Sequence, residues 1–280
     1  MKLVIYAGYY SPPYSPKTID ETGLGGTEQC IINLAKTLKS QNPIWDIWVV
    51  GGVVYGDYDG VMYRPTQDFK NEVKSVDTII GVSYIHYIKE FEGIDYTDSI
   101  LWVHNTEYYT WWNGQDIANH RELLLDSKLK SIICLTEWHK NIFIEQFPET
   151  KDKIQVIGNG VDTSKFQIGD KNLNQYIYTS HAERGLSQIL TEWDSILFKN
   201  PLAELKISTP QYGLEYFNLY YRDLVDNLDN VEFLGTLPQH ELYKLMAQST
   251  YWYYPSSYQE TFCITALEML GHGVQPITWE

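Results

Sequence analysis

The chain has 280 residues, of which 44% are hydrophobic and 15% aromatic, and its formal net charge is −15. This length suffices for two domains of ordinary size, and the negative charge argues against binding nucleic acid or anionic lipid with the whole surface. No apolar run approaches the roughly 18 residues of a membrane-spanning helix, and three scattered cysteines without metal spacing favour a reducing, cytoplasmic location.

Short apolar strands alternate with helical patterns in the first half of the chain. The opening residues, MKLVIYAGYY, have the pattern of a first core strand rather than of a signal peptide, because the apolar run is short and no cleavage site follows. Further strands are predicted at residues 44–50, 77–82, 99–104, 131–136 and 154–158. Helices are predicted at residues 27–39, 117–127 and 137–147.

The second half of the chain repeats this alternation. Strands are predicted at residues 175–180, 203–208, 231–235, 250–255 and 274–278, and helices at residues 185–198, 214–227 and 239–248. Continuous apolar strands joined by helices indicate parallel sheets that are covered on both faces. The predicted fold class is therefore α/β, with two doubly wound domains.

A segment rich in Gly, Asn, Asp and Lys, residues 156–175, has little periodicity and is predicted to link the two domains. We place the N-terminal domain at residues 1–165 and the C-terminal domain at residues 166–280. The sequence ends directly after a predicted strand, whereas a sheet of this type usually continues through another helix. We therefore expect a second domain that is shortened at its C-terminus.

Two glutamates, Glu260 and Glu268, flank the start of a helix that is predicted to run from Thr261 or Phe262 to about Leu270. The helix is apolar on nearly every face, which is typical of a buried helix, and an ionised carboxylate is costly there unless it is paired. The helix follows the penultimate predicted strand. Its start should therefore lie at the carboxyl edge of the sheet, where ligands bind in doubly wound folds.

The start of this helix is a candidate phosphate site. The free N–H groups of the first turn and the helix dipole attract phosphate, and the two glutamates could bind hydroxyl groups on either side of a diphosphate. Such a ligand is a nucleotide sugar. The alternative is that Glu260 caps the helix and Glu268 faces solvent, since two glutamates at this spacing are common.

The segment YQETFCITALEMLGHGVQPI, residues 258–277, resembles the donor-site motif of retaining glycosyltransferases of the GT-B fold, in the large family 4. The resemblance covers nearly the whole chain in order. GLGGTEQCIINLAKTL (23–38) resembles the glycine loop and first helix of the first domain, VIGNGVD (156–162) resembles the interdomain linker, and YTSHAERGLSQIL (178–190) resembles the start of the second domain. The linker departs from the usual pattern in having Gly158 where Pro is common.

The resemblance implies two Rossmann-like domains that face a cleft, with the acceptor bound by the first and the donor by the second. Arg184 would hold phosphate oxygens by paired hydrogen bonds, Glu260 would bind hydroxyls of the donor sugar, and Glu268 would bind the ribose. The alternative for Arg184 is a charge on a helix surface. A second cation, often a lysine in this family, is not evident. The other implied donor contacts are Ser180, the backbone at Thr236 and Leu237, and the first-turn residues Thr261, Phe262, Cys263 and Ile264.

In the first domain, Gly25 and Gly26 precede a helix and would let the backbone approach the donor closely. A dinucleotide fingerprint is a weaker reading of this loop, because Glu28 occupies the third glycine position and the loop lies well beyond the first strand. His104 ends a predicted strand. By resemblance it contacts the donor sugar and joins Arg184 and Glu260 as a catalytic residue, whereas on spacing alone a lone histidine there is more often structural.

Aromatic residues near the ends of two first-domain strands are candidates for stacking on an acceptor sugar. They are Tyr9, Tyr10, Tyr108, Tyr109 and Trp111. Ordinary packing or an oligomer contact is an equally open explanation for these side chains.

The segment Asp57-Tyr58-Asp59 matches the D-x-D pattern of metal-dependent glycosyltransferases of another, single-domain fold. It lies between glycines in GDYDG, so a turn is the favoured reading. Because GT-B enzymes stabilise the leaving diphosphate with helix ends and cations, we predict neither a metal nor a cofactor.

The resulting hypothesis is a retaining glycosyltransferase that moves a hexose from a UDP- or GDP-linked donor to a sugar or glycan acceptor. Its predicted partners are a nucleotide sugar and a carbohydrate, with no nucleic acid and no integral membrane segment. Two alternatives remain open: a nucleotide-sugar epimerase of the same fold, and a non-catalytic module that binds sugars or nucleotides.

Overall fold

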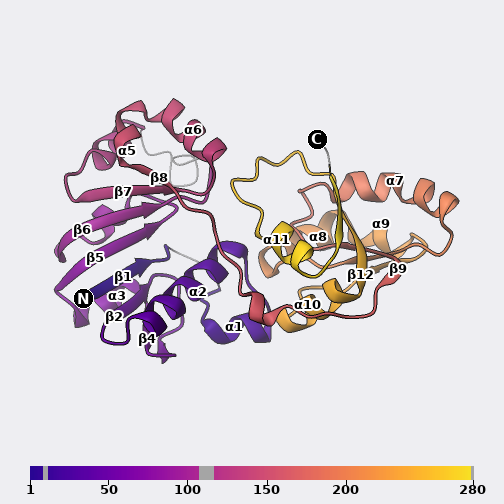
Figure 1. The fold of residues 1–280 in the computed structure, drawn as a ribbon, viewed down its shortest axis with the longest axis horizontal. Coiled ribbons are helices and arrows are strands. Elements are labelled where there is room, and N and C mark those ends of the chain that lie inside the picture. Colours follow the sequence, from indigo (N-terminus) through magenta and orange to yellow (C-terminus); the bar gives the residue numbers. More distant parts are fainter. Residues whose placement is uncertain (9–11, 107–116, 279–280) are drawn as a thin grey trace. The chain divides into compact units, whose positions relative to one another are not determined.

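The computed structural model describes residues 1–8, 12–106 and 117–278. The chain divides into two compact units, the first made of Met1–Pro16 and Thr27–Gly160 and the second of Lys17–Gly26 and Val161–Glu280 (Figure 1). Each unit contains a sheet flanked by helices. The acceptor and donor roles that the sequence suggests for the two domains stay predictions.

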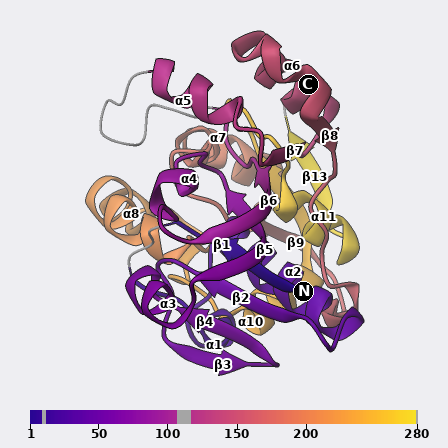
Figure 2. The same ribbon diagram turned by 90° about the vertical axis from the view of Figure 1, so that its left-hand side faces the viewer.

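The first unit is doubly wound. Among the described residues its sheet has the order β3-β4-β2-β1-β5-β6-β7-β8, which Figure 2 shows from β3 at the lower end to β8 at the upper end. The strands are β1 (Lys2–Tyr6), β2 (Asp46–Val50), β3 (Gly56–Tyr58), β4 (Val61–Arg64), β5 (Ser75–Val82), β6 (Asp95–Trp102), β7 (Leu129–Cys134) and β8 (Ile154–Val156). The helices are α2 (Gly26–Gln41), α3 (Thr66–Glu72), α4 (Tyr87–Glu90), α5 (Ile117–Leu124) and α6 (Glu137–Gln146). Among the strand pairs of the described residues, only β3–β4 is antiparallel.

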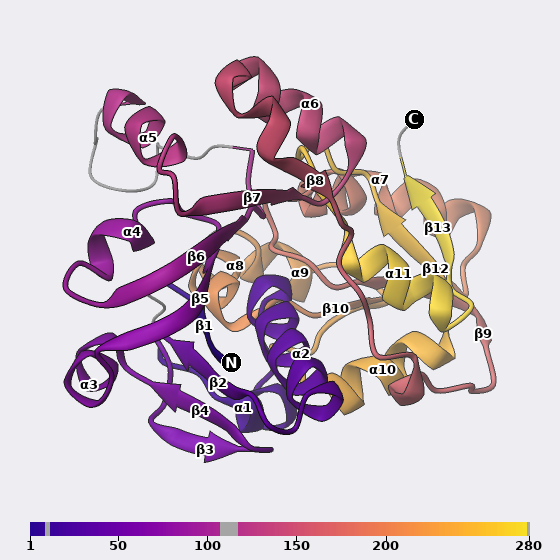
Figure 3. The same cartoon turned by 60° about the vertical axis from the view of Figure 1, so that its left-hand side comes forward.

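The second unit has a parallel sheet with the order β11-β10-β9-β12-β13 in the described part of the chain. Its strands are β9 (Asn172–Tyr178), β10 (Glu204–Ile207), β11 (Val231–Phe233), β12 (Ser249–Tyr254) and β13 (Gln275–Thr278). Its helices are α1 (Pro16–Glu21), α7 (Leu186–Lys199), α8 (Leu214–Tyr220), α9 (Arg222–Asp226), α10 (Gln239–Gln248) and α11 (Ile264–Gly271). Helix α11 lies beside the paired strands β12 and β13 (Figure 3).

The strand order of the second sheet reverses between β9 and β12. From β9 the chain winds through β10 to β11, and it then crosses back to β12 and continues to β13. Because crossovers between parallel strands are right-handed, α7, α8 and α9 cover one face of the sheet while α10 and α11 cover the other. The carboxyl ends of β9 and β12 thus form a topological switch point, the usual ligand position in such sheets.

Each unit has its own apolar core. In the first, buried side chains of the central strands pack against aromatic residues such as Phe69 and Phe143. In the second, Ile177, Leu205 and Trp252 of the sheet pack with Trp193 of α7. Continuous burial along the central strands follows from helices on both faces of a parallel sheet.

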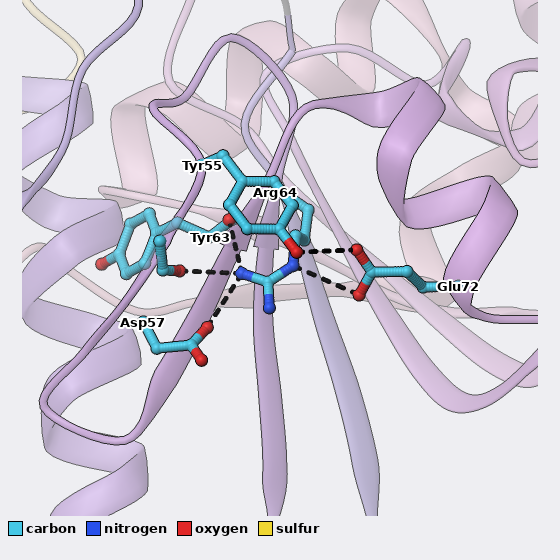
Figure 4. Close-up of polar contacts among 6 residues, drawn as sticks. Tyr55, Asp57, Tyr63, Arg64 and Glu72 are labelled. Carbon is cyan, nitrogen blue, oxygen red and sulfur yellow. Dashed lines mark hydrogen bonds and ion pairs between the residues drawn. The ribbon is translucent and has the colours of Figure 1, made fainter.

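Arg64 connects the β3–β4 hairpin, at the edge of the first sheet, to α3. Its side chain is only 8% exposed, and the guanidinium carbon lies 4.1 Å from the centre of the Tyr55 ring. The guanidinium donates hydrogen bonds to the carbonyl of Gly56 and, as Figure 4 shows, to the carbonyl of Tyr63 and the carboxylates of Asp57 and Glu72. This network pairs the buried charge and satisfies two carbonyls of the hairpin.

The strands predicted from the sequence are all present, with boundaries shifted by a few residues. The single helix predicted at residues 214–227 is wrong, because the chain forms α8 and α9 with a break at Tyr221, whose φ is −124°. The sequence reading also missed the β3–β4 hairpin and the short helices α1, α3 and α4.

Candidate active site

The turn after β9 places Arg184 at the switch point of the second sheet. Gly185 adopts φ +100°, and a Cβ atom there would lie 2.6 Å from the carbonyl oxygen of Pro255, which follows β12. A side chain at this position would therefore clash with backbone. The close approach brings the turn that carries Arg184 against the segment that leads from β12 to Glu260.

Arg184 and Glu260 form an ion pair, with Nη1 3.0 Å from Oε1. The same carboxylate oxygen accepts a hydrogen bond from the hydroxyl of Tyr254 at 2.7 Å, and the Tyr258 ring centre lies 4.0 Å from the guanidinium carbon. Burial lowers the pKa of Arg184, but the Glu260 charge and nearby tyrosines outweigh it and raise the pKa above its usual value. Arg184 is therefore a fixed, permanently charged group rather than a charge on a helix surface.

Helix α11 begins at Ile264, later than predicted, with Cys263 as its N-cap residue. Its burial is also less complete than predicted, since Leu270 is 58% exposed. Glu268 is nevertheless buried, and its Oε1 accepts a hydrogen bond from the Tyr243 hydroxyl at 2.7 Å. The alternative reading, in which Glu260 caps the helix and Glu268 faces solvent, is wrong.

Burial raises the pKa of Glu268 to about 7, and the hydrogen bond from Tyr243 opposes this shift. The Cys263 thiol also has its pKa raised, to about 11, by burial and by the charge of Glu260. At neutral pH this thiol is protonated and is a poor nucleophile. The start of α11 offers backbone amides, and Glu268 adds one titrating carboxylate about one turn further along the helix.

Several hydroxyl groups gather at the carboxyl edge of the second sheet. Ser180, a predicted donor contact, is buried after β9. Thr179, Thr209 and Thr236 follow β9, β10 and β11 respectively, and each has a buried hydroxyl oxygen without a hydrogen-bond partner in the described ranges. Because buried polar groups are normally paired, these hydroxyls suit a ligand with its own donors and acceptors.

The glycine-rich loop, residues 23–26, belongs to the second unit. A Cβ atom on Gly23 would lie 2.5 Å from the carbonyl oxygen of Leu237, and one on Gly26 would lie 3.1 Å from Cδ1 of Ile264. The loop thus meets the predicted base-binding backbone and the first residue of α11. Helix α1 comes between β1 and this loop along the sequence. In a dinucleotide fingerprint the glycine-rich loop follows the strand directly.

His104 lies in the first unit, two residues after β6, and is buried. Its Nδ1 is 3.4 Å from the Thr27 hydroxyl and its ring centre is 4.5 Å from that of Trp102. Burial, with a smaller effect of His139, lowers the pKa of His104 to about 3. The imidazole is therefore neutral at physiological pH and can act on a substrate through hydrogen bonds rather than through charge.

His139 is a supporting residue that the sequence reading missed. Its Nδ1 accepts a hydrogen bond from the Leu135 amide at 3.1 Å, so the ring proton must be on Nε2, which lies 3.0 Å from the carbonyl oxygen of Asn105. Burial lowers the pKa of His139, in keeping with this neutral form. The interaction anchors the segment immediately after His104.

The predicted acceptor residues Tyr9, Tyr10, Tyr108, Tyr109 and Trp111 lie outside the described residues. Asp57 and Asp59, the D-x-D pair, are each matched with a cation: Asp57 with Arg64 at 2.8 Å and Asp59 with Lys36 at 3.3 Å. Asp59 and Gly60 both have positive φ, as in a two-residue hairpin turn. Among the described residues, no group of three or more His, Cys, Asp or Glu could hold a metal ion.

No protein-family model matches the sequence, and no curated protein matches it. Comparison of the structure with solved structures is more informative. HepE from Anabaena, in complex with UDP and glucose, is 13% identical with a TM-score of 0.73, and the match covers 99% of this chain and 80% of HepE. The chain has the GT-B fold.

Two further GT-B neighbours agree with this assignment. Sucrose-phosphate synthase from Thermosynechococcus elongatus is 11% identical with a TM-score of 0.72, covering 99% of this chain and 81% of its own. WaaG, a glycosyltransferase involved in lipopolysaccharide biosynthesis, is 13% identical with a TM-score of 0.66, covering 99% of this chain and 80% of its own. At these identities the likeness establishes the GT-B fold. Every helix in the described ranges is too short or too polar to cross a bilayer.

Proposed function

We propose that the protein is a retaining glycosyltransferase, which moves a hexose from a UDP- or GDP-linked donor to a sugar or glycan acceptor. The observation that carries this proposal is the Arg184–Glu260 ion pair at the switch point of the second sheet. HepE, a structural neighbour, has been solved with UDP-glucose, which makes this class of donor the natural one to test.

The donor is proposed to bind with its diphosphate between Arg184 and the start of α11. Among the described residues, the ion pair with Glu260 engages only Nη1 of the guanidinium, so Nε and Nη2 can bind phosphate oxygens in a paired arrangement. The first-turn amides of α11 add uncharged donors and the positive end of a helix dipole. Neutral amides together with one fixed cation suit a diphosphate in an otherwise acidic protein.

Glu260 and Glu268 are proposed to bind hydroxyl groups on either side of the diphosphate. Glu260 uses Oε1 for Arg184 and Tyr254, which orients Oε2 for a sugar hydroxyl. Glu268 is proposed to bind the ribose, and the hydroxyls of Thr179, Thr209 and Thr236 are proposed to contact the nucleoside. His104, in its neutral form, is proposed to hydrogen-bond the hexose.

The proposed transfer occurs on one face of the donor sugar. The bond between the anomeric carbon and the diphosphate oxygen breaks, and the acceptor oxygen forms a new bond on the same face. The acceptor hydroxyl proton passes to the departing diphosphate, so no enzyme nucleophile is required. Arg184 and the helix amides stabilise the charge that develops on the diphosphate, the type of electrostatic stabilisation that often contributes most to catalysis.

The test is an NMR assay of UDP- and GDP-hexoses with a panel of sugar acceptors. The proposal predicts an acceptor-dependent glycoside whose anomeric configuration matches that of the donor. Arg184→Ala should lower kcat/KM by about 100-fold or more, as expected for losing a group that stabilises transition-state charge. Glu260→Gln should also impair transfer.

Arg222→Ala is a matched control. It also removes an arginine from an ion pair in the second unit, but its partner Asp226 is 53% exposed and Arg222 itself is 45% exposed. Its activity should equal that of the unaltered protein. Undiminished transfer in both Arg184→Ala and Glu260→Gln would refute the assigned roles. Inversion of a sugar carbon without acceptor would instead show an epimerase, and tight donor binding without turnover across the panel would show a binding module.

A further inference from the structure

A directed chain of hydrogen bonds runs from Lys165 to Glu268 inside the second unit. Lys165 Nζ donates to Gln239 Oε1 at 2.9 Å, Gln239 Nε2 donates to the Tyr243 oxygen at 3.2 Å, and the Tyr243 hydroxyl donates to Glu268 Oε1 at 2.7 Å. These hydrogen bonds connect Lys165, which lies shortly after the second segment of the unit begins at Val161, with two residues of α10 and the carboxylate of α11.

The direction of each hydrogen bond is fixed by chemistry. The lysine ammonium can only donate, so the Gln239 amide must turn its oxygen to Lys165 and its nitrogen to Tyr243. Tyr243 then accepts from Gln239, and its single proton goes to Glu268. Gln239, Tyr243 and Glu268 are all buried, and buried networks of this kind hold their members in one arrangement when every member is satisfied.

The residues around this chain are packed closely enough to hold it. The ring centre of Phe166 lies 5.9 Å from that of Tyr243, in an edge-to-face contact, and 4.8 Å from that of His272. The ring centres of Tyr243 and His272 are 4.8 Å apart. A Cβ atom on Gly271 would lie 2.0 Å from the Phe166 ring, so only glycine fits. Tyr243 therefore has little freedom to leave Glu268.

Only one oxygen of the Glu268 carboxylate is used by this network. In the described ranges, the hydrogen bond from Tyr243 falls on Oε1, and the carboxylate has no other hydrogen-bond partner there. A buried carboxylate that served packing alone would be costly, since an apolar residue of similar size avoids the desolvation. Because Tyr243 holds the carboxylate at Oε1, the other oxygen, Oε2, is suited to accept hydrogen bonds from a ligand.

We propose that Tyr243 is a positioning residue, which, backed by Gln239 and Lys165, fixes Glu268 Oε1 and so presents Oε2 to the vicinal hydroxyls of the nucleotide ribose. This inference rests on the proposed function, because it assumes that a nucleotide binds at α11. It adds a residue from α10 whose side chain does not itself contact the nucleotide.

The proposal has a consequence for pH dependence. Ribose hydroxyls donate most strongly to an ionised carboxylate, and Glu268 has its pKa raised to about 7 by burial. Nucleotide affinity should therefore rise as the pH passes through about 7 and then level off. Losing the Tyr243 hydrogen bond raises the pKa of Glu268 further, so a variant should need a higher pH for the same affinity.

Charged and titratable groups other than Glu268 lie along and around the hydrogen bonds that connect Lys165 to Glu268. They are Asp162, Lys165, Lys171, Glu260, Cys263 and His272. His272 Nδ1 contacts the Glu268 carbonyl oxygen at 2.7 Å, but burial lowers the pKa of His272, so this ring is already neutral where Glu268 titrates. Lys171 donates to the carbonyls of Met246, Ser249 and His272 and is a structural cation.

The test compares the affinities of UDP and GDP with those of their 2′,3′-dideoxy counterparts by calorimetry between pH 6 and pH 9. Tyr243→Phe keeps the ring and removes one hydroxyl. It should weaken binding of the ribonucleotide about 10-fold at pH 7, in line with the loss of one hydrogen bond to a charged group, and should shift the pH profile to higher pH. The dideoxy ligand should show no difference between the variant and the unaltered protein.

Tyr176→Phe is the matched control, because Tyr176 is a partly buried tyrosine of the same unit that stacks on Tyr251. It should leave affinity and pH profile unchanged. A direct NMR titration of the Glu268 carboxyl group should show a higher pKa in Tyr243→Phe, whether or not a ligand is present.

Four results would overturn the proposal. Equal weakening of both ligands by Tyr243→Phe would show a merely structural role, and an unchanged ribonucleotide affinity with an unchanged carboxyl titration would show no role at all. Absence of any nucleotide binding by the unaltered protein would overturn the proposed function and this inference together. Normal nucleotide binding without the predicted difference would overturn this inference alone.

Discussion

One carboxylate oxygen of Glu260 accepts hydrogen bonds from both Arg184 and Tyr254. Glu260 Oε1 lies 3.0 Å from Arg184 Nη1 and 2.7 Å from the Tyr254 hydroxyl. The cation proposed for the phosphates and the acid proposed for the donor sugar are therefore coupled without any ligand. The ion pair therefore favours one arrangement of these two groups before the donor binds.

This coupling is measurable in a double-mutant cycle. Arg184→Met and Glu260→Gln should each destabilise the protein, and the double variant should be less destabilised than the sum of the two. Because the side chains are 30% and 23% exposed, solvent weakens the pair, and we expect a coupling of about 1 kcal/mol from urea unfolding. Additive effects would show that the pair contributes nothing to the fold of the site.

Glu268→Gln should stabilise the protein in a pH-dependent way. The pKa of Glu268 is raised from 4.5 to about 7 by burial, so the folded state binds its proton more tightly than the unfolded state. The favourable free energy that comes from this tighter proton binding is therefore fully present below about pH 4.5, and it is lost as the pH rises through about 7.

Glutamine keeps the acceptor for Tyr243 and cannot ionise. The stability of Glu268→Gln relative to the unaltered protein should thus increase between pH 4.5 and pH 8, by up to about 3 kcal/mol. Thermal unfolding at a series of pH values measures it. A stability difference that stays constant with pH would contradict the raised pKa.

His104→Asn should lower the rate of transfer without changing the shape of the pH profile. Because burial lowers the pKa of His104 to about 3, the imidazole is neutral from pH 5 upward, and its loss removes hydrogen bonding only. We expect kcat/KM to fall by about 10-fold. If the acidic limb of the profile between pH 5 and pH 7 disappears in the variant, His104 titrates there and the assignment is incorrect.

Arg64→Met should destabilise the first unit and leave nucleotide binding untouched. It removes a buried guanidinium that bonds two carbonyls and two carboxylates (Figure 4). Since Asp57 is 66% and Glu72 is 36% exposed, solvent can replace part of what is lost, and we expect about 1–3 kcal/mol. Urea unfolding provides the measurement. A loss of nucleotide affinity together with stability would show that the hairpin supports the site.

Much of the fold could be predicted because its strands are buried on both faces. Residues 47–50 of the predicted strand 44–50 are a continuous apolar run, and they form the buried part of β2. The ligand position then follows from the rule for carboxyl edges of parallel strands. Arg184 and Glu260 follow β9 and β12, and both were assigned from the sequence to the same predicted donor site.

The contacts that were missed depend on packing between distant segments. Tyr243 and Glu268 meet because α10 and α11 lie on the same face of the sheet, a relationship that no local pattern encodes. The spacing of Gln239 and Tyr243, four apart on a helix face, was a visible but weak signal. The sequence signal for the β3–β4 hairpin was Asp59-Gly60, a favoured pair in two-residue turns.

The most direct measurement is a crystal structure of the protein with UDP or GDP, whichever binds more tightly in calorimetry. We predict phosphate oxygens within hydrogen-bond distance of Arg184 and of the first amides of α11, with the ribose hydroxyls at Glu268 Oε2. A nucleotide bound elsewhere, with the start of α11 filled by protein side chains, would contradict the proposed donor site.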